Sequence, residues 1–191
     1  MKLTKKQQIE HKARELFWKH GFKKVTIDEI CKKSNVSRKT FYTFYENKTD
    51  LVMYIFNEEM EAGFRIYEEI VNSGLSFSDK IQGLFEYKYR NTKDFSMELV
   101  ADFFHPDGGE LLEFFKKAVE KSILLMREFL KKAQENGEMN PELSLDYVMW
   151  LMQKSVEYCG TQEMLALFPD AESMTRQVSQ SLIYGIMPVK K

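Results

Sequence analysis

Apolar residues recur at helical spacing along most of the chain, and turn residues separate the runs. The helix predicted over residues 4–20 carries one buried stripe, made of Ile9, Ala13, Leu16 and Phe17. Further helices are predicted over residues 47–71, 76–89, 95–104, 110–134, 144–167 and 171–186. No segment shows the alternating pattern of a strand. The sequence therefore predicts an all-α fold.

The stretch over residues 25–51 carries the most specific pattern in the chain. Thr26 has the sequence context of a capping box at the start of a short helix. Asn35 then falls where the chain must turn, and asparagine tolerates the left-handed conformation well. Ser37 is a good N-cap for a second helix, predicted to end at Phe44. Two short helices joined by a tight turn are typical of a helix-turn-helix, whose second helix lies in the DNA major groove.

This stretch resembles the N-terminal domain of the TetR-type (tetracycline-repressor-like) bacterial transcriptional regulators. The residues that carry the resemblance are Gly21, Thr26, Ile27, Ile30, Cys31, Val36, Ser37, Thr40, Phe41, Tyr42, Tyr45, Lys48 and Leu51. The family usually has glycine where Asn35 stands. The resemblance covers about the first 50 residues. It implies a helix-turn-helix DNA-binding domain over residues 1–50, followed by a helical effector-binding and dimerisation domain over residues 51–191.

Several side chains in and around the second short helix have the reach and chemistry to contact DNA. The predicted contacts are Thr26, Ser37, Arg38, Lys39, Thr40, Tyr42, Thr43 and Lys48. Arg38 and Lys39 are long donors near the start of this helix, where guanine edges can be read. Tyr42, Lys48 and Thr26 are predicted to hold phosphates, because they offer a phenol, an ammonium and a hydroxyl beside helix N-termini.

Charge is divided unevenly along the chain. Residues 1–50 contain 13 lysines and arginines against 6 acidic residues, whereas residues 51–191 contain 15 against 23. A basic N-terminal part binds a polyanion by neutralising phosphates and releasing counterions. The acidic remainder is expected to stay away from nucleic acid. Double-stranded DNA is therefore the predicted partner of the first 50 residues.

Other residues of the N-terminal part are interpreted as core. Phe41, Phe44 and Tyr45 are predicted to pack inside the domain, and Cys31 to act as a small buried hydrophobe. Cys31 and Cys159 lie far apart in the sequence and do not make a disulfide framework. A reducing cytoplasm is therefore the expected location.

The last two predicted helices have features of a subunit interface. Residues 147–152 are apolar on every side of a helix, and this longest apolar run is far too short to cross a bilayer. One side can pack in its own core, and a twin subunit is the simplest partner for the other. The final helix has a stripe with small residues, made of Met174, Val178, Ser181, Leu182 and Gly185. We expect a twofold homodimer through these helices, with an ordinary internal core as the alternative.

The C-terminal part is richer in aromatic residues and methionines than a small core requires, which predicts a mostly apolar pocket for a small-molecule effector. The candidate ligand contacts are Phe64, Phe85, Tyr89, Phe104, His105, Phe115, Met126, Phe129, Trp150, Gln153 and Glu157. The predicted function is a repressor of a palindromic operator. Its effector would stabilise a geometry in which the two DNA-binding domains no longer match that operator.

Two other classes of function remain as alternatives. One is a DNA-bound adaptor whose C-terminal part binds a protein partner, and the other is a helical enzyme. The chain has three histidines and contains no CxxC, HExxH, phosphate-binding glycine loop or nucleophile elbow. We therefore expect no catalytic residues, no metal and no cofactor.

Overall fold

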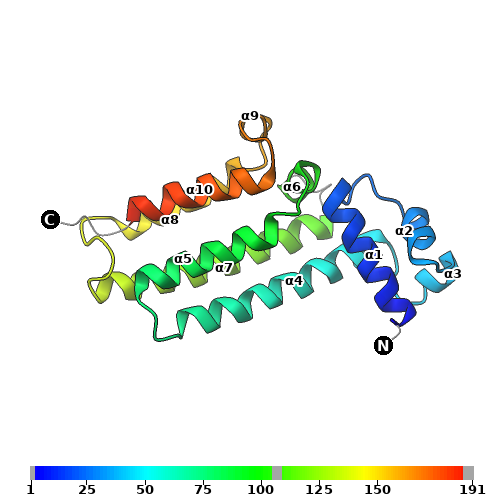
Figure 1. The fold of residues 1–191 in the computed structure, drawn as a ribbon, viewed down its shortest axis with the longest axis horizontal. Coiled ribbons are helices and arrows are strands. Elements are labelled where there is room, and N and C mark those ends of the chain that lie inside the picture. Colours follow the sequence, from blue (N-terminus) through cyan, green and yellow to red (C-terminus); the bar gives the residue numbers. More distant parts are fainter. Residues whose placement is uncertain (1–2, 105–108, 187–191) are drawn as a thin grey trace.

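The computed structural model describes residues 3–104 and 109–186, and every regular element in these two segments is a helix. The elements are α1 (Lys5–His20), α2 (Ile27–Ser34), α3 (Arg38–Phe41), α4 (Lys48–Val71), α5 (Phe77–Thr92), α6 (Met97–Phe104), α7 (Gly109–Glu135), α8 (Leu145–Tyr158), α9 (Gln162–Ala166) and α10 (Ala171–Ile186). The molecule is elongated, with a head of α1–α3 at one end of a long body made of α4–α10 (Figure 1). The all-α prediction is confirmed, and none of the described helices is long and apolar enough to cross a membrane.

Polar residues in the sequence determine where most of these helices begin. In each case a side-chain oxygen accepts a hydrogen bond from a backbone amide three residues later, at Thr4, Thr26, Ser37, Asn47, Ser76, Ser144 and Thr161. Such a cap satisfies an otherwise unpaired amide and stabilises a helix by roughly 1 kcal/mol. The turn between α2 and α3 is equally local, since Asn35 adopts the predicted left-handed conformation with φ 53° and ψ 48°.

Two predicted helix boundaries are wrong. The second helix of the helix-turn-helix ends at Phe41, and the chain continues to Phe44 as turns. The single helix predicted over 144–167 is divided, because α8 ends at Tyr158 and α9 starts only after Thr161. Between them Gly160 is buried so tightly against Phe104 that an added Cβ would overlap the phenylalanine side chain.

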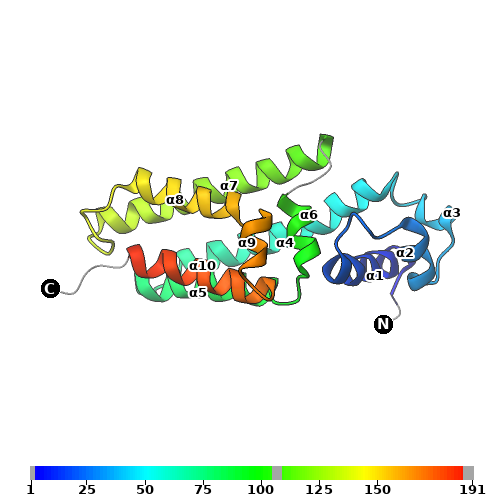
Figure 2. The ribbon, with the colours of Figure 1, turned by 90° about the horizontal axis from the view of Figure 1, so that it is seen from above.

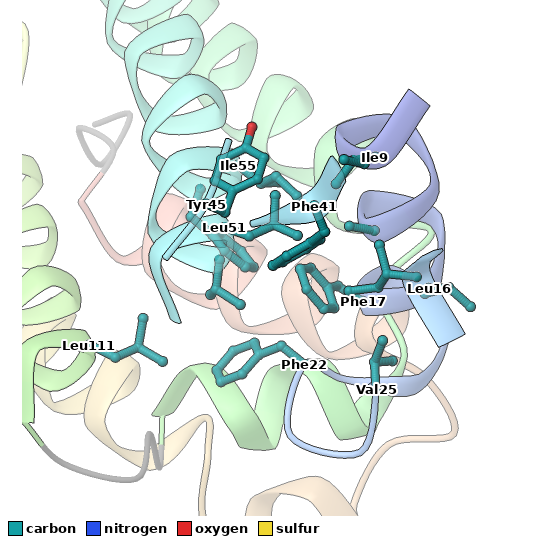
Figure 3. Close-up of a cluster of buried hydrophobic side chains, with 14 of the residues drawn as sticks. Ile9, Leu16, Phe17, Phe22, Val25, Phe41, Tyr45, Leu51, Ile55 and Leu111 are labelled. Carbon is teal, nitrogen blue, oxygen red and sulfur yellow. The ribbon is translucent and has the colours of Figure 1, made fainter. Parts of the chain in front are cut away.

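The head core is shared with the body. Phe17, Phe41 and Leu51 lie at its centre, each with no exposed surface (Figure 3). The same cluster includes Leu99 from α6 and Phe115 from α7. Burying such side chains contributes roughly 1.5–3 kcal/mol each, so α6 and α7 help to hold the head in place.

In the body, five helices form a closed ring. Each of α4, α5, α10, α8 and α7 packs against the next in this order, and α7 returns to α4. Figure 2 shows α5 beside α10 and α7 beside α8, and Figure 1 shows α4 along the edge opposite α8 and α10. One buried cluster lies at the end of the ring far from the head, around Ile81, Phe129 and Met149. A smaller one, around Val100 and Met174, joins α6 to α10.

Candidate nucleic-acid interface

Helix α3 lies at the end of the molecule opposite the C-terminus, held by one aromatic residue (Figure 1). Phe41 has no exposed surface, and its ring lies 5.4 Å from Tyr42 and 5.8 Å from Tyr45. Lys39, two residues before the buried Phe41, lies on the opposite side of the helix and is exposed, and Arg38 is exposed as well. The helix therefore presents cationic side chains to the solvent from a fixed base.

The two cations of α3 have different surroundings. Arg38 lies with Nη1 3.1 Å from Asp28 Oδ1, and its hydrogen bond with Tyr42 together with the Asp28 carboxylate raises the pKa of Arg38. Lys39 is exposed and has no hydrogen bond or ion pair with any described residue. The Lys39 ammonium therefore extends into solvent, whereas the Arg38 guanidinium is paired with Asp28.

Hydroxyl groups predicted to contact DNA also hold the local fold. The Oγ of Ser37 accepts a hydrogen bond from the Thr40 amide at 3.1 Å and lies 2.9 Å from the Thr40 hydroxyl. Thr43 donates its hydroxyl to the Thr40 carbonyl at 2.6 Å. Thr26 caps α2 through the Glu29 amide at 3.2 Å. These residues shape the motif whether or not DNA is bound.

Lys48 has a structural role that the sequence did not indicate. Its ammonium donates to the carbonyls of Lys23 and Val25, each at 3.0 Å, and the side chain is half-buried. The two bonds connect the loop after α1 to the first turn of α4. The predicted phosphate contact of Lys48 would therefore come from a side chain already fixed in position.

The core predictions for this segment are confirmed in part. Phe41, Cys31 and Tyr45 are buried, and the Tyr45 hydroxyl donates to Glu10 Oε1 at 2.5 Å. Burial and the Glu10 carboxylate both raise the pKa of Tyr45. The prediction for Phe44 is wrong, because 41% of this residue is exposed. Since α3 ends at Phe41, Phe44 falls on a turn and not on the inner side of a helix.

A buried carboxylate joins the head to the body. Asp102 of α6 accepts a hydrogen bond from the Lys23 amide at 2.8 Å. Gly21, at φ 74°, passes so close that a side chain there would overlap the carboxylate. Beside this link the Ser96 amide donates to the Trp18 carbonyl at 2.8 Å. Sequence reasoning missed Asp102, because nothing near it marks a partner 79 residues away.

A shallow groove runs between α1 and the loop before α6. Its lining includes the charged residues Arg14, Glu15, Lys93 and Asp94 beside Trp18. It is open to solvent and lies outside the body ring. A groove of this kind does not match the apolar pocket predicted among the body helices.

The predicted ligand contacts are dispersed over the body. Phe115 belongs to the head core, Phe85, Met126 and Phe129 to the far cluster, and Phe104 to the cluster around α6 and α10. Phe64 lies under the Lys121 ammonium, and Tyr89 is bonded to Glu172 and Arg176. Trp150, Gln153 and Glu157 are exposed on α8, and His105 lies outside the described residues. The structure does not bring these residues together into one site.

The outer face of α8 exposes large apolar side chains in a single subunit, around the ion pair of Lys154 and Glu157. Tyr147, Trp150 and Tyr158 are 54%, 55% and 60% exposed, and Leu151 is 37% exposed. The stripe predicted on the last helix as part of the interface is not exposed along its whole length. Met174 of that stripe is buried within its own subunit, in the cluster that α10 shares with α6. Helix α10 also packs against α5 of the same subunit.

Comparisons with known proteins agree with this architecture. Residues 9–55 match the family model described as bacterial regulatory proteins, tetR family. The chain is 27% identical over 139 residues to the HTH-type transcriptional regulator YhgD of Bacillus subtilis, covering 72% of this chain and 71% of the relative. It is 28% identical over 165 residues to the probable acrEF/envCD operon repressor of Escherichia coli K12, covering 77% and 70%.

Solved structures share the fold at low sequence identity. The regulatory protein TetR from Rhodobacter sphaeroides superposes with a TM-score of 0.72 at 17% identity, covering 95% of this chain and 98% of that one. The regulator FadR from Bacillus subtilis, solved in complex with stearoyl-CoA, gives 0.71 at 18% identity, covering 94% and 98%. These similarities show that the fold is shared.

Proposed function

From its place among the TetR-type bacterial transcriptional regulators, we propose that this protein is a cytoplasmic repressor that binds a palindromic operator as a homodimer. In this proposal residues 1–50 are the DNA-binding domain and residues 51–191 bind a small apolar or amphipathic effector and the second subunit. The effector releases the protein from DNA. The observation that carries the proposal is the exposed, cationic α3 held on a buried aromatic base.

Charge and position support DNA as the partner of the head. The 13 cations and 6 acidic residues of positions 1–50 favour binding to phosphates, which supplies most of the non-specific affinity for duplex. Base contacts from Lys39 and Arg38 would then add sequence preference. Tyr42 is 48% exposed beside them and is proposed to bind a phosphate.

The uncovered face of α8 supports a twofold dimer. A surface with three large aromatic residues exposed is unusual on a monomer and is typical of an interface. Two subunits joined there would hold two copies of α3 in a fixed relation. Such a pair reads half-sites about 34–36 Å apart, which is one turn of the duplex.

The Asp102 link supports a route by which the body controls the head. A change in the position of α6 would move the Asp102 carboxylate, and with it the Lys23 amide and the loop after α1. The shared core at Leu99 and Phe115 would transmit the same movement. To weaken operator binding five- to 150-fold, an effector must favour the altered geometry by about 1–3 kcal/mol.

Replacing Lys39 with alanine is expected to relax base preference at one position of each half-site, with a loss of about 1–3 kcal/mol of discrimination there. The measurement is to select duplexes from a random pool with the wild type and the variant, and to compare the retained sequences. Lys131→Ala, which removes an exposed charge from the far end of α7, is the control. An unaltered preference profile in Lys39→Ala would remove this residue from base recognition.

A further inference from the structure

Arg38, the first residue of α3, is paired with a carboxylate of the preceding helix. Its Nη1 lies 3.1 Å from Oδ1 and 3.3 Å from Oδ2 of Asp28, so one nitrogen of the guanidinium faces both carboxylate oxygens. Both side chains are open to solvent, with 61% of the Arg38 side chain and 67% of the Asp28 side chain exposed. The pair therefore lies on the outer surface of the helix-turn-helix, where an incoming duplex would meet it.

The local fold fixes the distance between these two charges. Thr26 caps α2, and Asp28 lies in the first turn of that helix, where the helix dipole favours a carboxylate. Ser37 caps α3 directly before Arg38. The left-handed Asn35 makes the turn between the two helices, which pack against each other. The motif itself therefore brings together two side chains that are ten positions apart in the sequence.

In the part of the chain that the structure describes, Asp28 is the one acidic residue that forms an ion pair with α3. Glu10 and Glu15 pair with lysines of α1, and Asp50 accepts a hydrogen bond from the Glu46 amide before α4. A carboxylate beside α3 repels DNA phosphates, so it opposes the attraction that the basic head provides. The charge of Asp28 therefore lowers the general affinity for DNA at the helix that is proposed to read bases.

Phosphates and base edges respond differently to this pair. A phosphate carries a full charge, which is attracted by the Arg38 guanidinium and repelled by the Asp28 carboxylate, so the two effects oppose each other. The O6 and N7 atoms of guanine are uncharged acceptors, on which this repulsion does not act. A guanidinium has donors on all three nitrogens. The Asp28 contact engages one nitrogen and Tyr42 bonds to the same group, which leaves N–H groups for a base edge while Asp28 stays paired.

We propose that Asp28 determines the DNA specificity of this head by pairing with Arg38, so that Arg38 binds base edges and is withheld from phosphates. Asp28 improves discrimination by weakening binding to the wrong DNA, and it needs no contact of its own with the right one. The inference rests on the proposed function, to which it adds a positioning residue on α2. Asp28 is not among the DNA contacts predicted from the sequence, which were chosen as donors to bases and phosphates.

The test measures the affinity of the full-length protein for two duplexes between about 50 and 200 mM salt. One is the operator that wild type selects from a random pool, and the other has the same composition in scrambled order. Asp28→Asn keeps the size of the side chain and removes its charge. At the lowest salt it is expected to bind the scrambled duplex about tenfold more tightly than wild type, with a salt slope steeper by about 0.9 for each head, because Arg38 then binds a phosphate. Its operator affinity should rise by no more than about threefold, so its preference for the operator falls.

Glu15→Gln is the matched control, since Glu15 is an exposed carboxylate of the same head that pairs with Lys12. It removes one negative charge from α1 and none from the helix-turn-helix, so it should leave the ratio of the two affinities unchanged. Combining Asp28→Asn with Arg38→Ala tests the pairing itself. Without the guanidinium, the change at Asp28 should no longer raise the affinity for the scrambled duplex about tenfold. All variants should unfold within a few degrees of wild type, because exposed ion pairs contribute little stability.

The proposal is overturned if Asp28→Asn keeps the wild-type ratio of operator affinity to scrambled-duplex affinity. It is also overturned if Asp28→Asn raises the affinity for the scrambled duplex equally with and without Arg38, because Asp28 would then act through its own charge alone. Wild type separates these results from a failure of the proposed function. A wild-type protein without affinity for either duplex would contradict the DNA-binding assignment itself, and the role of Asp28 with it.

Discussion

Glutamate in place of Trp150 is expected to leave the protein monomeric and to lower its affinity for a two-half-site operator by about 10²–10⁴-fold. Trp150 is 55% exposed, and its ring stacks with that of Tyr147 at 6.3 Å between centroids. If the variant formed the dimer through this face of α8, the new glutamate would be an unpaired carboxylate buried in an apolar interface, which costs several kcal/mol. Loss of the dimer removes the gain from binding two linked half-sites.

Sedimentation measures the oligomeric state of Trp150→Glu, and duplex binding measures its affinity for the operator. Leu75→Glu is the control, since Leu75 is 53% exposed in the loop between α4 and α5. It should stay dimeric and bind the full operator normally. Both variants should bind a single half-site like wild type. A Trp150→Glu protein that remained dimeric would place the interface elsewhere and leave the α8 surface for a different protein partner.

Phe41→Ala is expected to lower the free energy of unfolding by about 3–5 kcal/mol, because it leaves a cavity in the centre of the head core. Phe41 has no exposed surface and lies beside Phe17 and Leu51 (Figure 3). The change is large against a total stability of about 5–15 kcal/mol for a typical protein. It also removes the base on which α3 is held, so duplex affinity should fall with it.

Urea unfolding of Phe41→Ala and Phe44→Ala provides the comparison. Phe44 is 41% exposed on the turn after α3, so its removal should change stability by only about 0.5 kcal/mol. The two substitutions remove the same side chain three residues apart. Equal losses in the two variants would contradict the assignment of Phe41 as the anchor of α3.

The head could be predicted closely because its signals are local. Thr4, Thr26 and Ser37 each cap a helix a few residues away, and Asn35 adopts the left-handed turn that its side chain favours. The length of α3 could not be predicted in the same way. The sequence after Phe41 continues with residues that a helix tolerates, whereas in the structure residues 42–44 form turns before the chain reaches the buried Tyr45.

Features that depend on distant partners were not visible in the sequence. At Gly160, between α8 and α9, Phe104 approaches too closely for a side chain, and the role of Asp102 depends on the Lys23 amide. The aromatic content of the body indicated apolar contacts without assigning them to a site, and the structure divides them among separate clusters.

The most direct test of the account is the affinity of the full-length protein for duplex DNA as a function of salt. If the basic head of a dimer neutralises about six phosphates, affinity should fall roughly 10³-fold between 50 and 200 mM salt. Single-stranded DNA of the same length should show a shallower slope. Affinity that does not change with salt, or no binding to duplex at all, would contradict the claim that this head is a DNA-binding domain.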